Sequence, residues 1–236
     1  MKHFVCALLV CVLPVRAGAQ ETEESGPPTF GGGINLLYGS PQGEFSTYVD
    51  RAWGVGANLL WTPAAARFLG LRLEGGFMNY GHETYRVPLS GTIGGRVLVD
   101  LTTDNNIAWV GIGPQVMVPS GPIRPYANAA AGLAYFATTS SVRGDDSGDT
   151  FASDTNYDDA VFQWAVGGGT LIPISRGRTP VAIDLSARYH GNGRVSYVTE
   201  GGIEDNDDGS ITINAIESKA RVLSFHIGLA IAFGGR

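Results

Sequence analysis

The stretch Leu223–Phe233, with the sequence LSFHIGLAIAF, decides the fold. Its large apolar side chains occupy every second position, and serine, histidine, glycine and alanine fill the positions between them. A period of two residues is typical of a β-strand with one apolar face, whereas an amphipathic helix would need a period of about 3.6. This segment is therefore predicted to be a strand that meets an apolar environment on one side only.

The same alternation recurs along the chain from Thr29 onwards. The fourth segment could be divided by a turn at Thr102–Asn106, so ten strands remain an alternative to eight. Short connections containing proline and arginine alternate with longer polar loops at 41–50, 81–94, 141–158 and 198–217. Short turns at one end and long loops at the other are typical of an up-and-down barrel of the outer-membrane kind. The eight predicted strands are residues 30–39, 51–62, 69–83, 95–118, 124–140, 159–174, 180–196 and 218–233.

The first 19 residues have the features of a secretory signal peptide. Lys2 precedes an apolar stretch, and the small residues Ala17 and Ala19 form a cleavage site for an exported protein. Both cysteines, Cys6 and Cys11, lie in this leader, so the mature chain is predicted to have no disulfide and no thiolate site. The predicted organisation is a signal peptide at 1–19, a short flexible segment at 20–28 and a barrel at 29–236.

Composition excludes two classes of protein. The 236 residues include 34 glycines, and 44% are hydrophobic, but no apolar run reaches the roughly 18 residues that a membrane-spanning helix needs. The formal net charge of −6 argues against a nucleic-acid partner, because binding to nucleic acid depends on neutralising phosphates. An all-β chain that forms a closed antiparallel barrel fits these limits.

Alternation alone leaves open which face points outward. A soluble, lipocalin-like periplasmic barrel would turn the apolar face inward around a hydrophobic ligand, whereas a transmembrane barrel would turn it outward to lipid. The other face carries many small residues, among them Gly54, Gly167 and Gly228, which suit a narrow eight-stranded interior. It also carries charges of both signs, which can pair in a lumen. We therefore predict a transmembrane barrel and keep the soluble barrel as the alternative.

This orientation predicts two groups of residues. Charged and imidazole side chains on the inner face are expected to form a polar network that fills the lumen, because unpaired charges in a narrow interior are costly. Its predicted members are Arg72, Glu74, Asp184, Arg188, His190 and His226. Aromatic residues near the strand ends are expected to form lipid-facing girdles at the two membrane interfaces. Their predicted members are Phe30, Tyr38, Trp53, Trp61, Tyr135, Phe162, Tyr189 and Phe233.

With these features the chain resembles the small outer-membrane β-barrels of the OmpA and OmpX type. Local phrases at Pro41–Phe45, Arg124–Ala129 and Ala187–Gly193 are similar to those of outer-membrane β-barrel domain families. The resemblance implies a place in the bacterial outer membrane, among its lipid and lipopolysaccharide. It also implies biogenesis through periplasmic chaperones and the outer-membrane insertion machinery. The implied role is structural, adhesive or one of narrow permeation; the sequence does not indicate an oligomeric state.

Neither catalysis nor a cofactor is expected. The segment around His190 is loosely similar to the His-x-Ser-Asn stretch of lipid A deacylase barrels, but Asn192 stands in place of the nucleophile, and Ser196 and Glu204 are only distant substitutes. Residues 204–209 resemble the start of a Ca²⁺ loop, with Glu204, Asn206 and Asp208 as a weak candidate site. The twelfth position is Ala215, which lacks the carboxylate that closes such a loop. A solvated acidic loop is the favoured interpretation, and no metal site is predicted.

Overall fold

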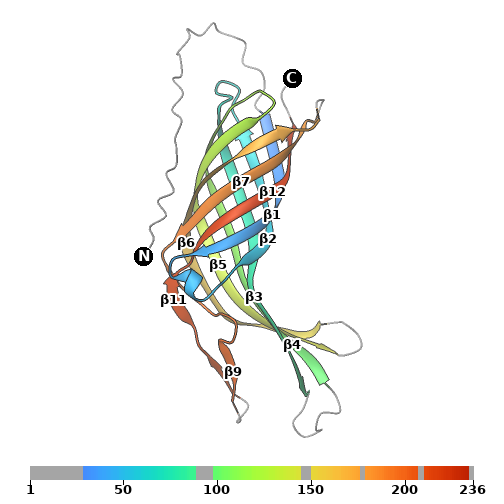
Figure 1. Ribbon diagram of the computed structural model, residues 1–236, viewed down its shortest axis with the longest axis vertical. Coiled ribbons are helices and arrows are strands. Elements are labelled where there is room, and N and C mark those ends of the chain that lie inside the picture. Colours follow the sequence, from blue (N-terminus) through green and yellow to red (C-terminus); the bar gives the residue numbers. More distant parts are fainter. Residues whose placement is uncertain (1–28, 89–97, 145–149, 176–178, 207–209, 234–236) are drawn as a thin grey trace.

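The computed structural model describes residues 29–88, 98–144, 150–175, 179–206 and 210–233, so the predicted signal peptide (1–19) and the segment 20–28 lie outside it. Within these residues, eight antiparallel strands close into a ring in the order β1-β12-β7-β6-β5-β4-β3-β2 (Figure 1). The predicted closed eight-stranded barrel is confirmed. The barrel strands are β1 (Thr29–Gln42), β2 (Ala52–Thr62), β3 (Leu69–Pro88), β4 (Leu98–Met117), β5 (Arg124–Gly144), β6 (Thr150–Pro173), β7 (Val181–Asn192) and β12 (Arg221–Phe233).

The alternative of ten strands is wrong. Thr102–Asn106 lies inside the continuous strand β4 and pairs with both β3 and β5. The irregularity at this level is on the neighbouring strand, where the β3–β4 register shifts between Asn79 and Gly81. Tyr80 is therefore an extra residue in β3, and such a bulge bends a strand without ending it.

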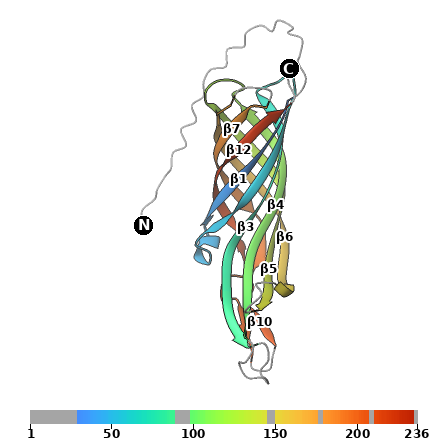
Figure 2. The same cartoon turned by 90° about the vertical axis from the view of Figure 1, so that its right-hand side faces the viewer.

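The predicted loops at 81–94 and 141–158 are wrong for residues 81–88, 141–144 and 150–158, which belong to strands, whereas residues 89–94 and 145–149 lie outside the described residues. β2 stops pairing with β3 at Asn79 and β7 stops pairing with β6 at Gln163, but β3 to β6 run on beyond the ring as a protruding sheet (Figures 1 and 2). Their few apolar side chains, such as Tyr85, Leu101 and Val142, which pair across β3, β4 and β5, form a run too short for periodicity to mark these segments as strands. Cross-strand polar contacts accompany their pairing, such as the 3.1 Å contact between the hydroxyls of Thr84 and Thr102.

The other two long connections fold back as small elements at the same end. The 41–50 connection forms the 3₁₀ helix η1 (Phe45–Thr47). The predicted strand 180–196 ends as β7 at Asn192, and the short strand β8 (Arg194–Tyr197) pairs with β11 (Ile216–Lys219). β9 (Ile203–Asp205) and β10 (Ile211–Ile213) form a second hairpin.

Most of the large apolar side chains of the ring point outward. Leu229 of β12 pairs with Ile34 of β1 and Ile183 of β7, and the exposed fractions of Leu229 and Ile34 are 49% and 69%. Chain neighbours on the opposite face, such as Asn35 beside Ile34 and Asp184 beside Ile183, are buried inside the ring. This orientation is the reverse of what a soluble, lipocalin-like barrel needs. Among the described residues, no helix has the length and hydropathy to cross a membrane.

Inward glycines let neighbouring strands come close together. A Cβ added at Gly228 would lie 2.0 Å from the backbone oxygen of Ile34. At Gly76 it would lie 2.4 Å from the ring of Trp109, which pairs directly with Gly76 across β3 and β4 and covers it. The glycine-rich inner face is therefore a requirement of a narrow, closely packed interior.

Candidate functional site

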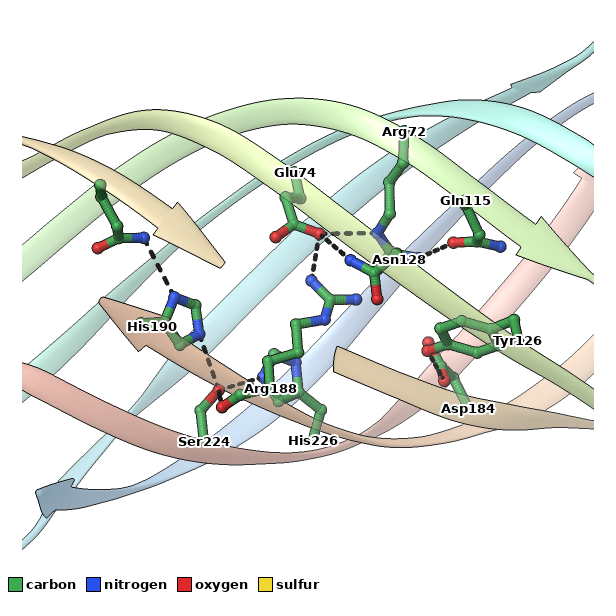
Figure 3. Close-up of polar contacts among 11 residues, drawn as sticks. Arg72, Glu74, Gln115, Tyr126, Asn128, Asp184, Arg188, His190, Ser224 and His226 are labelled. Carbon is green, nitrogen blue, oxygen red and sulfur yellow. Dashed lines mark hydrogen bonds and ion pairs between the residues drawn. The ribbon is translucent and has the colours of Figure 1, made fainter. Parts of the chain in front are cut away.

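Glu74 is the centre of a buried polar network in the barrel (Figure 3). Its Oε2 accepts hydrogen bonds from Arg72 Nε at 2.9 Å and from Arg188 Nη1. Asn128 Nδ2 donates to the same oxygen at 3.4 Å. Arg72, Glu74 and Arg188 are each at most 4% exposed, so one carboxylate bridges two buried guanidinium groups that come from β3 and β7.

Asp184 is the second buried carboxylate. Its Oδ1 accepts a hydrogen bond from the hydroxyl of Tyr126 at 2.7 Å, and the guanidinium of Arg72 lies 5.8 Å from the centre of the Tyr126 ring. Arg72 also donates from Nη1 to Gln115 Oε1 at 2.8 Å. The two carboxylates and two guanidinium groups balance in formal charge, which lowers the cost of burying them.

The two predicted histidines lie on either side of Ser224. His190 Nε2 is 2.9 Å and His226 Nε2 is 2.7 Å from Ser224 Oγ, and Gln163 Nε2 is 3.1 Å from the other ring nitrogen of His190. Ser224 has no exposed surface, so this Ser–His arrangement offers a substrate no access. The structure thus brings the six predicted lumen residues into one region of the interior, together with Gln115, Tyr126, Asn128, Gln163 and Ser224, which the sequence reasoning missed.

The distant catalytic substitutes do not join His190. Ser196 is in β8, where its backbone N–H donates to Asp159 Oδ2, and Glu204 is in the β9–β10 hairpin. Asn192 donates from Nδ2 to the backbone oxygen of Ala220. These residues have separate structural partners, and none of them supplies a nucleophile to the imidazole.

A second group of side chains, which the sequence reasoning also missed, fills the other half of the interior. We call it the aromatic plug; it comprises Phe45, Tyr80, Phe136 and Tyr197, with exposed fractions of 0 to 7%. The Phe45 ring is 5.1 Å from that of Tyr197, 5.6 Å from that of Tyr80 and 6.5 Å from that of Phe136. Such edge-on contacts favour a rigid cluster. Tyr80 and Phe136 have the inward parity of their strands, which is the one sequence signal that could have indicated the plug.

Two connections at the long-loop end bring Phe45 and Tyr197 into the barrel. Phe45 belongs to η1 and Tyr197 to β8. The hydroxyl of Tyr80 donates to the backbone oxygen of Val198 at 3.0 Å, and the hydroxyl of Tyr197 is 2.8 Å from that of Ser218 on β11. The plug is therefore made from both strand and loop residues.

Trp109 lies between the polar network and the aromatic plug: its ring centre is 5.4 Å from that of His190 of the network, and it belongs to the same buried apolar cluster as the plug residues. A cavity of about 10 Å³ remains at this junction, lined among others by Phe136, Gln163 and Val222. Such a volume holds about one water molecule. The two layers are thus in contact, with no wide space between them at this level.

Of the predicted girdle residues, all but Tyr189 are at least 36% exposed, and Tyr189 is half-buried against Trp164 with ring centres 5.8 Å apart. Phe30 pairs with both Trp61 and Phe233, which places these three residues at the short-turn end. Tyr38 lies 4.7 Å from Trp53 between ring centres, toward the other end. Trp164, 42% exposed, also faces outward and was not among the predicted residues.

The candidate metal loop has other interactions. Glu204 Oε1 accepts a hydrogen bond from Asn214, and Asn206 Nδ2 donates to Ser210 and Thr212, within the β9–β10 hairpin and its flank. Asp208 lies outside the described residues. Among the residues that the structure describes, no three histidine, cysteine, aspartate or glutamate side chains are grouped so as to hold a metal ion.

Nearby, the hairpin of β8 and β11 carries an exposed ion pair. Arg194 Nε donates to Glu217 Oε1 at 2.8 Å, and this hydrogen bond raises the pKa of the guanidinium.

A closed ring of eight strands with an apolar exterior and a closely packed interior that holds a buried polar network is the architecture of a transmembrane β-barrel. Comparison with protein-family models gives no match, and neither does comparison with curated proteins.

Among solved structures, the chain is similar to Ail, the attachment invasion locus protein of Yersinia pestis, at 13% identity and a TM-score of 0.44, over 89% of this chain and 99% of that one. It is also similar to a major outer membrane protein from Thermus thermophilus, at 14% identity and a TM-score of 0.44, over 87% and 99% of the two chains. The outer membrane protein OprG from Pseudomonas aeruginosa gives 12% identity and a TM-score of 0.39, over 89% and 97%.

Proposed function

We propose that this protein is an integral β-barrel of the bacterial outer membrane with a non-conducting lumen, which anchors the protruding sheet of β3 to β6 at the cell surface. Its role is structural or adhesive, and it has no enzymatic activity. The single observation that carries this proposal is the filling of the interior by two successive layers, the polar network and the aromatic plug. Narrow permeation, a role that the sequence left open, would need a continuous path through both layers.

The outward-facing residues support the membrane setting. The apolar side chains Phe225, Ile227, Leu229, Ile231 and Phe233 alternate over nine residues of β12, and all five are at least 42% exposed. A membrane-spanning strand needs about 9 to 11 residues, so this face matches the thickness of a bilayer. Outer-membrane lipid and lipopolysaccharide are the partners that this surface fits.

The route to the membrane is part of the same proposal. The leader at 1–19 directs export, residues 20–28 connect it to the barrel at 29–236, and periplasmic chaperones and the insertion machinery deliver the chain. The protruding sheet then faces the medium, because the short turns of such barrels lie on the periplasmic side.

Solute flux through reconstituted vesicles tests the closed lumen. Vesicles containing the folded barrel are expected to swell in small sugars no faster than empty vesicles, because two packed layers fill the interior. Swelling that increases with the amount of inserted protein would contradict the proposal.

A charge on the lipid-facing surface tests the membrane setting. Leu229→Arg is expected to destabilise the barrel folded in vesicles by about 2–4 kcal/mol, which is typical of arginine near the bilayer midplane. The matched control is Tyr85→Arg on the protruding sheet, where 53% of the side chain is exposed outside the ring and no loss is expected. Heat-modifiable gel mobility and urea titration measure both variants, and normal insertion of Leu229→Arg would rule out the membrane setting.

A further inference from the structure

The short-turn end of the barrel contains a cavity of about 450 Å³ that opens toward the turns and ends at the polar network; we call it the vestibule. Three arginines, Arg67, Arg72 and Arg124, line it, whereas Asp184 is the one acidic side chain among its described lining residues. Its size is in the range of small-ligand pockets. The vestibule is thus a cationic hollow with a mixed polar and apolar lining, on the side opposite the protruding sheet.

The charges of the vestibule do not balance. Arg72 and Arg188 inside the barrel are matched by Glu74 and Asp184, which leaves no carboxylate of the network for the arginines at the rim. Arg124 donates from Nε to the backbone oxygen of Val118 at 3.3 Å and from Nη2 to the sulfur of Met117 at 3.5 Å, and both acceptors are neutral.

The turns around Arg67 and Arg124 add no acidic residue. Residues 63–68, between β2 and β3, and residues 118–123, between β4 and β5, contain neither aspartate nor glutamate. Arg67 lies in the first of these turns and is exposed at the mouth of the vestibule. Two cationic groups thus face this opening without a counter-charge of their own in the part of the chain that the structure describes, which favours an anion there.

The inner wall of the vestibule is built from buried polar side chains. Arg72 is 4% exposed, and its contacts to Glu74 and Gln115 fix the guanidinium at the inner end (Figure 3). Asn58, also lining the vestibule and 9% exposed, has a buried Nδ2 with no hydrogen-bond partner among the described residues. Fixed guanidinium groups and spare amide donors are suited to an oxyanion, because guanidinium forms paired hydrogen bonds to phosphate oxygens.

We propose that the vestibule is a binding site for a phosphate group that enters from the short-turn side. Arg67 and Arg124 attract and hold the phosphate at the rim, and Arg72 with Asn58 forms the inner end. This goes beyond the proposed function, since a closed lumen alone needs no ligand. A phospholipid headgroup of the adjoining leaflet and a free phosphate in the periplasm present the same chemistry.

Titration of the full mature barrel in a non-ionic detergent with inorganic phosphate, followed by calorimetry, tests the site. Saturable binding is expected, and Arg67→Gln with Arg124→Gln in one chain is expected to weaken it at least tenfold. Arg143→Gln is the matched control, because it removes the same kind of charge from the protruding sheet, where Arg143 contacts Thr150. It is expected to leave binding unchanged. The substituted residues lie at the rim and in the protruding sheet, so each variant is expected to fold. Heat-modifiable gel mobility checks that it does.

Two results would overturn the proposal. One is binding of phosphate that does not saturate in the wild-type barrel. The other is an equal loss of binding in the Arg143→Gln control, which would indicate a general effect of net charge.

Native mass spectrometry then distinguishes the two sources of the phosphate group. After release from vesicles that contain phosphatidylglycerol, lipid retained by the wild type and by Arg143→Gln, but lost from the double variant, identifies a headgroup site. Phosphate binding without retained lipid identifies a site for the free anion.

Discussion

The two halves of the barrel interior are filled by opposite means. Toward the short-turn end, strand residues alone form a charge-balanced network around Glu74, whereas toward the long-loop end Phe45 and Tyr197 enter from connections and pack against strand residues. The network depends on matched charges, so its failure should be abrupt when one partner is removed. The plug depends on apolar contact, so its cost should grow with the volume removed. The comparison predicts different responses to mutation in the two halves.

Removing the central carboxylate should have the largest effect. Glu74→Gln leaves Arg72 and Arg188 buried without their shared counter-charge. We therefore expect the variant to lower the free energy of unfolding by about 3–5 kcal/mol, the range for a broken buried ion pair. Urea titration of the barrel in vesicles measures the loss. Replacing Arg72, Glu74 and Arg188 by methionine together with Asp184 by asparagine should restore much of the stability, because all four buried charges of the network are then removed. A fourfold variant as unstable as Glu74→Gln would show that charge balance is not what holds this half together.

Truncating the plug should have the next largest effect. Phe45 is fully buried against three other aromatic rings, so Phe45→Ala should cost about 3 kcal/mol, at the low end for a core phenylalanine. The loss should be confined to the long-loop end, since η1 can detach while the ring of strands stays paired. Hydrogen exchange is expected to increase around Tyr197 and to stay slow around Glu74. Equally fast exchange in both halves would mean that the two layers form one cooperative unit.

An exposed ion pair beside the plug should contribute least. Arg194 and Glu217 join β8 to β11 at 2.8 Å, but both side chains are more than half exposed. Arg194→Gln should leave the urea midpoint unchanged within error, because surface ion pairs contribute little. A midpoint shift as large as that of Phe45→Ala would show that this hairpin, and not the aromatic packing, positions the plug.

The sequence predicted the ring well because the membrane imposes a strict rule on it. Between Leu223 and Phe233 each outward position must be apolar, so the period of two is clear and marks the strand, while its facing follows from the small and charged residues on the opposite faces of the strands. The inward charges at Arg72, Glu74 and Arg188 could be assigned to one face by parity. Their contacts with one another depend on how β3 and β7 are placed across the lumen, because these strands are not neighbours in the ring. Parity does not contain that information.

The long-loop end could not be predicted in the same way. The outer segment of β3 from His82 to Arg86 is polar on both faces, because water surrounds the protruding sheet, so it has the composition of a loop. Phe45 and Tyr197 are separated by about 150 positions in the chain and meet only after two connections fold into the barrel. A contact of this kind is decided by tertiary packing, and neither residue lies in a periodic segment long enough to reveal it.

Single-channel recording in planar bilayers tests the closed interior most directly. The wild-type barrel and the Phe45→Ala variant should both show no stable conductance steps, because the polar network still fills the lumen when the plug is weakened. Reproducible openings of the wild-type barrel, at a frequency that follows the amount of inserted protein, would contradict the two-layer account of this molecule.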